Sequence, residues 1–143
     1  MGDHLKPQPA PAANDKAAVW DLVAQDLEQD EGRLAAGPMP SRPWAERHVV
    51  ALVRADAKAR DVYGREHYGT PLQAGNGRDA LVDAYQEALD LAVYLRQALE
   101  EQRESAFTPD RQDYVVEHLT LLYANARGTV RHLRWLLYAR DGR

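Results

Sequence analysis

The chain of 143 residues is 45% apolar and 28% charged, which is typical of a water-soluble globular domain and not of a disordered or membrane-embedded chain. It contains no cysteine, which excludes disulfides, thiolate metal sites and a cysteine nucleophile. The formal net charge of -4 argues against a nucleic-acid partner, because such proteins usually present a basic surface. We expect no membrane partner either, since the apolar runs are too short to span a bilayer, and cytoplasmic location is the default expectation.

Helical periodicity dominates from the N-terminus onward, and no segment alternates as a strand would. The opening segment is polar and proline-rich, so we predict a disordered leader over 1–14 and a single domain over 15–143. A first helix is expected from about Asp15 to Glu31. A second is expected from about Trp44 to Tyr63, after a break rich in glycine and proline.

Two further helices complete the predicted architecture. A third runs from about Asn76 to Glu104, with Asn76 as its cap, and a fourth begins at Thr108-Pro109-Asp110. Unbroken, the fourth would be about 45 Å long at 1.5 Å per residue, so it either breaks near Gly128 or extends to pack on another chain. These elements predict an all-α bundle of four or five helices.

Four carboxylates follow one face of the third predicted helix. At 100° per residue they fall within an arc of about 80°: Asp79, Asp83, Glu87 and Asp90. The helix dipole favours the first two, which lie near the N-terminus. It does not explain the last two, where like charges one turn apart repel each other. The face is therefore either a solvated surface or a site for a divalent cation such as Mg²⁺, which prefers oxygen ligands.

A single helix seldom completes the coordination of a cation, so a facing helix should supply further carboxylates. The second predicted helix offers Asp56 and Asp61, with Lys58 and Arg60 between them. Residues five apart lie on different faces of a helix, so we expect only one of these carboxylates to reach the metal. The alternative for this segment is an ordinary surface of mixed charge.

The segment EALDLAVYL, Glu87 to Leu95, resembles the second metal-binding helix of the all-α NTP pyrophosphohydrolases, the MazG-like and dimeric-dUTPase-like group. That family places a glutamate and an aspartate three residues apart before an apolar run, and Glu87 and Asp90 match this pair. The longer string YGTPLQAGNGRDALVDAYQEALDLAVYLRQ is similar to small MazG-like proteins of bacteriophage and actinobacterial genomes. The resemblance covers Asp56 to Gln102, less than half of the chain.

This resemblance implies a MazG-like bundle, completed as a dimer or tetramer, in the cytoplasm of a bacterium or a phage-infected host. It implies Mg²⁺- or Mn²⁺-dependent hydrolysis of a nucleoside triphosphate to a monophosphate and pyrophosphate. Its metal ligands would be Glu87 and Asp90, with Asp56 or Asp61, and the catalytic residues would be Asp83 and Glu87. The family's first metal helix carries a Glu-Glu-x-x-Glu cluster, and nothing in the second predicted helix of this chain matches it. The alternative is therefore a degenerate member, a helical module that binds a nucleotide or a protein without hydrolysis.

The segment YGREHYGTPLQAGNGR, Tyr63 to Arg78, is expected to form the loop that recognises the nucleotide. Its glycines let backbone amides approach an anion closely. The side chains expected to bind the nucleotide lie in this loop or just before it: Lys58, Arg65, Tyr68, Asn76 and Arg78. Alternatively, the segment only wraps the bundle.

The C-terminal stretch VRHLRWLLYARDGR, Val130 to Arg143, combines arginines with leucines and aromatic residues. We expect a core or dimer-interface helix, with arginines near its C-terminus, where the helix dipole favours them. The alternative is an amphipathic basic helix that lies on a membrane or on an acidic partner.

Overall fold

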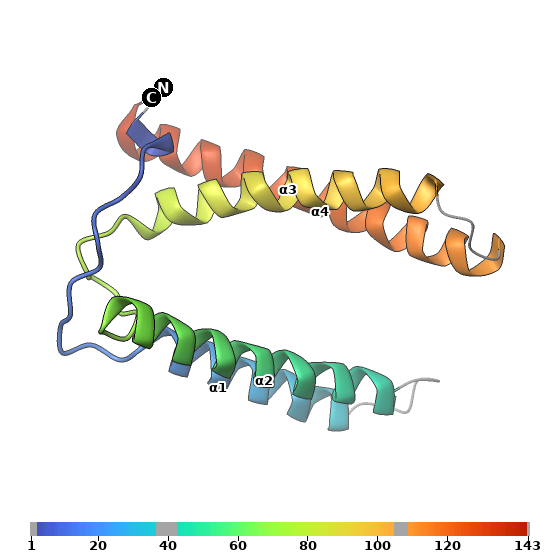
Figure 1. Cartoon of the computed structure of the whole chain (residues 1–143), viewed down its shortest axis with the longest axis horizontal. Coiled ribbons are helices and arrows are strands. Elements are labelled where there is room, and N and C mark those ends of the chain that lie inside the picture. Colours follow the sequence, from blue (N-terminus) through green and yellow to red (C-terminus); the bar gives the residue numbers. More distant parts are fainter. Residues whose placement is uncertain (1–2, 37–42, 105–108, 143) are drawn as a thin grey trace. The chain divides into compact units, whose positions relative to one another are not determined.

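The computed structural model describes residues 3–36, 43–104 and 109–142. Over these ranges the chain is all-helical and contains no strand, which confirms the predicted fold class at that level (Figure 1). Its elements in chain order are η1 (Asp3–Leu5), α1 (Val19–Ala36), α2 (Pro43–Tyr68), α3 (Ala80–Glu104) and α4 (Pro109–Asp141). None of the helices in the described ranges is both long and apolar enough to cross a membrane.

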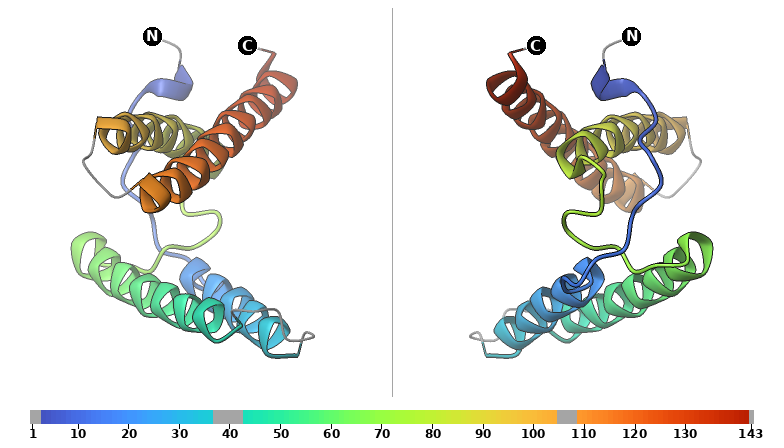
Figure 2. Two further views of the ribbon diagram at one scale, coloured as in Figure 1. Left: turned by 90° about the vertical axis from the view of Figure 1, so that its right-hand side faces the viewer. Right: turned by 90° about the vertical axis from the view of Figure 1, so that its left-hand side faces the viewer.

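The chain divides into two compact units, each described here by itself. One unit is Pro9–Arg78 and contains α1 and α2, which lie side by side. The other comprises Met1–Gln8 and Asp79–Arg143 and contains η1 with the pair α3 and α4 (Figure 2). The predicted boundaries, a leader over 1–14 and a domain over 15–143, stay predictions.

Two ion pairs show the antiparallel register of α1 and α2. Arg65 on α2 lies 3.8 Å from the carboxylate of Asp21 near the start of α1. Arg54, earlier on α2, pairs with Glu31 near the end of α1. The later residue of α1 pairs with the earlier residue of α2, so the two helices run in opposite directions. The two pairs are separated by a similar number of residues on each helix, and therefore by a similar length.

Helix α2 ends later than the sequence predicts, at Tyr68 and not at Tyr63. Its terminator is Gly69, which adopts a φ of 70° and donates its backbone N–H to the carbonyl of Arg65 at 2.9 Å. Glycine takes up this left-handed conformation without steric cost, which makes it the usual residue just past a helix end. The loop predicted from Tyr63 is therefore helical up to Tyr68.

The unit of α3 and α4 has its apolar core between these two helices. Val82 and Tyr85 on α3 pack with Leu137 on α4, and Leu137 is only 1% exposed. Further hydrophobic side chains pack around this cluster: Leu81, Leu89, Val130 and Leu133. The C-terminal stretch thus packs as a core helix, as predicted. Helix α4 continues through Gly128, so the alternative in which it breaks there is wrong.

Asp79, and not Asn76, caps the N-terminus of α3. Its Oδ1 accepts hydrogen bonds from the backbone N–H groups of Leu81, at 3.1 Å, and Val82, at 3.3 Å. The same carboxylate forms a two-pronged ion pair with Arg140 near the end of α4, at 2.6 and 3.0 Å. These hydrogen bonds hold the pKa of Asp79 below its usual range, the bond from Arg140 contributing most. Asp79 therefore joins the start of α3 to the end of α4.

The free energy of unfolding of the α3–α4 unit is expected to depend on pH through the ionisation of Asp79. The pKa of this carboxyl is lower in the folded chain than in the unfolded chain. Its stabilisation of the folded state is therefore complete above the unfolded pKa, about 4. That contribution is lost as pH falls through the folded pKa. The Asp79→Asn variant keeps a capping side chain but cannot ionise. Chemical unfolding at a series of pH values from about 6 to about 2 should show the two proteins converging on acidification, and a constant difference would contradict the assignment.

In the other unit, Gln73 ties the segment before α1 to the loop before α3. Its side chain accepts the backbone N–H of Asn14 at 2.9 Å and donates to the carbonyls of Asn14, at 2.7 Å, and Lys16. Ala18 pairs with Gln73 through an isolated antiparallel bridge, and the side chain of Gln73 is buried. Residues placed in or beside the predicted leader thus have specific hydrogen-bond partners in the structure.

Gln73→Ala is expected to destabilise the unit Pro9–Arg78 by about 1–3 kcal/mol, because buried backbone groups of the N-terminal segment lose their partner. Gln25→Ala is the matched control, since Gln25 lies exposed on α1 and has no hydrogen-bond partner in the described part of the chain. Urea denaturation of both variants measures the difference. Equal stabilities would show that Gln73 does not hold the segment in place.

Candidate functional site

The structure separates the four carboxylates of the acidic face by their partners. Asp79 caps α3 and pairs with Arg140 as described above, and Asp83 accepts a hydrogen bond from Nε2 of Gln8 at 2.9 Å. Glu87 and Asp90 are exposed, and neither has a hydrogen-bond or ion-pair partner among the described residues. Folding therefore accounts for the first two carboxylates and leaves the last two unexplained.

Large apolar side chains accompany the unexplained pair. Leu91 is 50% exposed and Tyr94 is 65% exposed. With Glu87 and Asp90 they occupy positions i, i+3, i+4 and i+7, the spacing of one helix face. We call these four residues the exposed α3 face. The sequence already contained this signal, because Tyr94 falls at about 60° on the same helical projection, inside the acidic arc.

The two candidate carboxylates of α2 differ in their surroundings. Asp61 is half-buried and accepts two hydrogen bonds from Nε of Arg65, both at 2.9 Å. Asp56 is exposed, with no partner in the described ranges, and lies on another face of α2. Both belong to the unit Pro9–Arg78, whereas Glu87 and Asp90 belong to the other. Across the described residues, no group of three or more His, Asp or Glu side chains is arranged to hold a metal ion.

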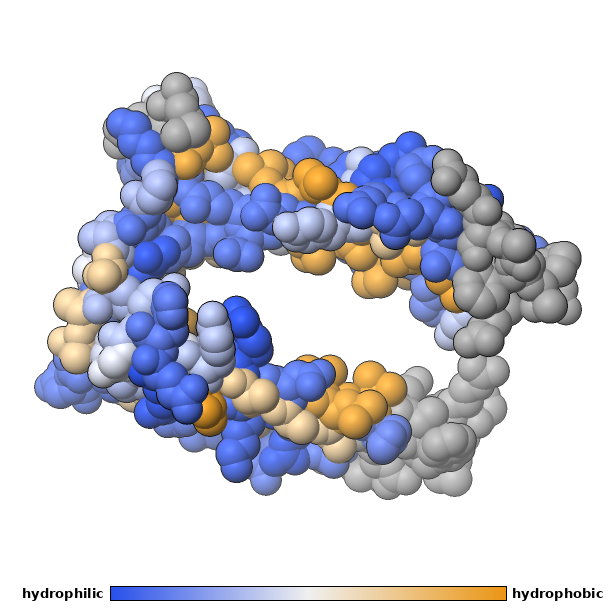
Figure 3. Space-filling model, in the orientation of Figure 1, coloured by the Kyte–Doolittle hydropathy of each residue, from blue (hydrophilic) through white to orange (hydrophobic). Residues whose placement is uncertain are grey.

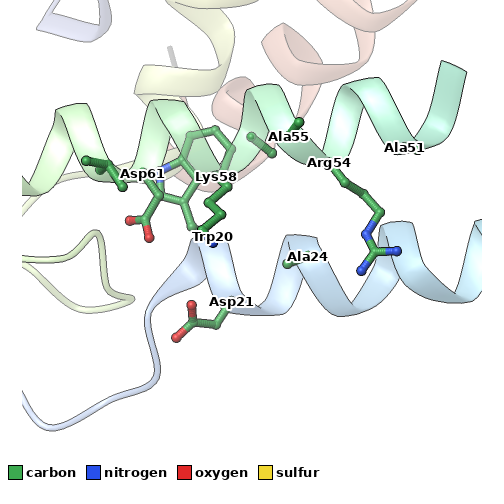
Figure 4. Close-up of a pocket in the computed structure, with 10 residues that line it drawn as sticks. Trp20, Asp21, Ala24, Ala51, Arg54, Ala55, Lys58 and Asp61 are labelled. Atoms are coloured by element: carbon green, nitrogen blue, oxygen red, sulfur yellow. The ribbon is translucent and has the colours of Figure 1, made fainter. Parts of the chain in front are cut away.

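A cavity of about 480 Å³ lies between α1 and α2, within the size range of small-molecule sites (Figure 4). Trp20 and Asp21 reach it from α1, and Lys58 and Asp61 reach it from α2. Small side chains on both helices leave the space open: Ala24, Ala51, Ala55 and Ala57. Of the residues predicted for the site, Lys58 and Asp61 are therefore brought to one place.

Among the described residues that line this cavity, one cation has no carboxylate partner. Arg54 is engaged with Glu31, and Asp61 is engaged with Arg65, whose pKa is raised by this hydrogen bond above all. Lys58 makes no ion pair within the described ranges. An ammonium group beside the indole of Trp20 suits a ligand that has an aromatic ring and a negative charge.

Trp20 is the lining residue that sequence reasoning missed. The signal that identifies it is the row of alanines on α2. Ala51 and Ala55 stand one turn apart on α2 and line the cavity on the side toward Arg54, with side chains too small to fill it (Figure 4).

The remaining residues predicted to bind a nucleotide are spread over the end of α2 and the following loop. Arg65 and Tyr68 lie on α2, and Tyr68 is exposed with its ring edge-on to His67. Asn76 is buried, and its Oδ1 accepts the backbone N–H of Arg78 at 3.1 Å. Arg78 donates to the carbonyl of Pro9 at 2.8 Å. Asn76 and Arg78 thus order the chain locally, and their role in nucleotide binding stays a prediction.

Comparison with known proteins adds no relative to this picture. No protein-family model, curated protein or solved structure matches the chain. Function is therefore inferred from the side chains of the two units: the exposed α3 face in one, and the cavity between α1 and α2 in the other.

Proposed function

We propose that the chain is a Mg²⁺-dependent nucleoside triphosphate pyrophosphohydrolase of the MazG-like kind. The observation that carries this proposal is the pair Glu87 and Asp90, which are exposed, nearly one turn apart and without partners in the described part of the chain. Like charges at this spacing repel each other, and a bound cation would offset that repulsion. Two carboxylates with free oxygens on one helix suit Mg²⁺, which binds proteins through one or two carboxylates together with substrate phosphates.

The chemistry of the site follows from its oxygen donors. Mg²⁺ held there would supply charge neutralisation at the phosphate oxygens and activation of water, so no protein nucleophile is required. Asp83 lies one turn before Glu87, where its carboxylate is positioned by Gln8. A carboxylate oriented in this way can accept the proton of an attacking water. We assign metal binding to Glu87 and Asp90, and proton transfer to Asp83 or Glu87.

Nucleotide binding belongs to the cavity between α1 and α2 in this proposal. The indole of Trp20 offers a surface on which a base can stack, and Lys58 offers a charge for a phosphate. The cavity volume of about 480 Å³ is sufficient for a base and part of the sugar. Asp56 and Asp61 lie on α2 of this unit, and their part in metal binding stays a prediction from the sequence.

Self-association is part of the proposal because both units expose large apolar side chains (Figure 3). The exposed residues lie on every helix: Leu22 and Val23 on α1, Val49, Leu52 and Val53 on α2, Leu91, Val93 and Tyr94 on α3, and Leu121, Leu122 and Trp135 on α4. Pairs of helices with apolar outer faces are stabilised when further helices cover them. A dimer or tetramer that completes the bundle would supply those helices.

The direct test is incubation of the purified chain with a panel of canonical and modified NTPs and dNTPs in Mg²⁺ or Mn²⁺. Chromatography should show a nucleoside monophosphate and pyrophosphate, and EDTA should stop the reaction. Release of inorganic phosphate with a diphosphate would indicate a different bond and would contradict the assignment. So would a folded sample that turns over none of the nucleotides.

A second candidate function is a binding module that holds a nucleotide without hydrolysing it. The cavity beside Trp20 favours it, since an indole and an ammonium group suffice for binding an aromatic anion. Under this alternative a nucleotide binds equally well with EDTA, and no pyrophosphate appears. Trp20→Ala should then remove binding, whereas Glu87→Gln should leave it unchanged.

A further inference from the structure

A groove of about 480 Å³ lies between α3 and α4. Its apolar lining comes from both helices: Leu89, Ala92 and Val93 on α3, and Val130 with the ring of Tyr123 on α4. The stretch of α3 that lines it, 89–96, is about 10 Å long at 1.5 Å per residue. This length and volume fit a small molecule better than a folded partner.

The charged side chains that line this groove are, among the described residues, all arginines. Arg96 contributes from α3, and Arg127 and Arg131, one turn apart, contribute from α4. Arg96 is paired with Glu100 at 2.6 Å. Arg127 and Arg131 have no carboxylate partner among the described residues. Within the described part of the chain, no Asp or Glu side chain lines the groove.

The ring of Tyr123 holds two of the guanidinium groups beside the groove. The guanidinium carbon of Arg127 lies 4.3 Å from the ring centre, and that of Arg96 lies 6.0 Å from it. Contact with the ring face stabilises each cation without neutralising its charge. The arrangement therefore keeps the N–H donors of Arg127 available to an anion while restricting where its side chain can go.

We propose that this groove binds a small organic phosphate, a dianion joined to an aromatic or other apolar body. Two guanidinium groups one turn apart repel each other, and a phosphate with several acceptor oxygens can take hydrogen bonds from both. The apolar floor of Leu89, Ala92 and Val93 stays in water if inorganic phosphate alone binds. A ligand that carries both a phosphate and an apolar body buries this floor and also binds the two arginines.

This site goes beyond the proposed function and is independent of it. Glu87 and Asp90 do not line the groove, and on a helical projection Glu87 lies on the side of α3 away from Leu89 and Arg96. Binding here needs neither Mg²⁺ nor hydrolysis. A product or effector that carries a phosphate would be held at a place separate from the carboxylates.

The test uses 1-naphthyl phosphate as the probe, with EDTA present, in a titration followed by backbone amide chemical shifts. We expect saturable shifts at Ala92, Val93 and Val130. The double variant Arg127→Gln/Arg131→Gln should bind the probe more weakly, with a dissociation constant raised at least 10-fold, because two charge-assisted hydrogen-bond donors are lost. The double variant Arg33→Gln/Arg60→Gln removes the same charge from α1 and α2 and should bind as the wild type does.

Two outcomes would overturn the proposal. One is that Arg127→Gln/Arg131→Gln binds the probe with the same affinity as the wild type, or shows the same chemical-shift changes at the same residues. The other is inorganic phosphate binding as tightly as the naphthyl ester, which would show that the apolar floor takes no part. Glu87→Gln should bind the probe normally, so failure of the hydrolase assignment and failure of this site give different results.

Discussion

Replacing Glu87 by glutamine, or Asp90 by asparagine, is expected to abolish pyrophosphate release while leaving the chain at least as stable as before. Loss of a carboxylate ligand should lower the rate by about 100-fold or more, since even outer-shell changes at metal sites cost about 10- to 100-fold. Neither side chain has a partner in the described ranges, so no native hydrogen bond is lost. Relief of like-charge repulsion along α3 should raise the free energy of unfolding by about 0.2–0.5 kcal/mol.

The matched control is Glu101→Gln, which removes the same charge from the same helix. Glu101 accepts a hydrogen bond from Gln97 and lies more than three turns beyond Glu87. It should retain full activity. Steady-state pyrophosphate release and urea unfolding, measured on the same preparations, separate the two effects. Full activity in both site variants would refute the metal assignment, and a loss of stability above about 1 kcal/mol would show that the pair serves the fold instead.

Residues that act locally were predictable from the sequence, and residues that depend on distant partners were not. Asn76 and Asp79 are both good caps, and spacing alone does not choose between them. The choice is made by Gln8 and Arg140, which bind Asp79 from 71 and 61 residues away in the sequence. With those partners in place Asp79 starts α3, and Asn76 forms a turn with Arg78 instead.

The end of α2 shows the same limit in another form. Gly64 lies inside α2, although an isolated glycine usually costs about 1 kcal/mol in a helix. The ion pair of Arg65 with Asp61, one turn earlier on α2, and its contact with Asp21 on α1 support the helix past this point. Only the second contact depends on the tertiary fold, and it is the one that spacing along the chain does not reveal.

The candidate site divides along similar lines. The 3.6-residue period was sufficient to place Glu87 and Asp90 on one face, since that relation holds in any helix. The cavity at Trp20 and Lys58 depends on the register of α1 against α2, in which Arg65 lies near Asp21 and Arg54 near Glu31. Register is a property of two helices together, so neither helix pattern alone predicts which side chains will share a cavity.

The largest expected effect on stability is at Leu137. Its side chain is 1% exposed and packs against Val82 and Tyr85, whereas the adjacent Leu136 is 45% exposed. Truncation of a buried leucine removes apolar contact and leaves a cavity, so Leu137→Ala should destabilise the α3–α4 unit by about 2–5 kcal/mol. Leu136→Ala removes the same atoms from the surface and should cost less than about 1 kcal/mol.

Amide hydrogen exchange is the appropriate measurement for this pair of variants, because it reports opening of α3 and α4 separately from α1 and α2. Leu137→Ala should lower the protection of α3 and α4 amides together, since Leu137 joins the two helices through Val82 and Tyr85. Protection in α1 and α2 should change little if the two units open independently. Equal effects of the two alanine variants would mean that α4 packs with a different face, and the core assigned to this unit would then be wrong.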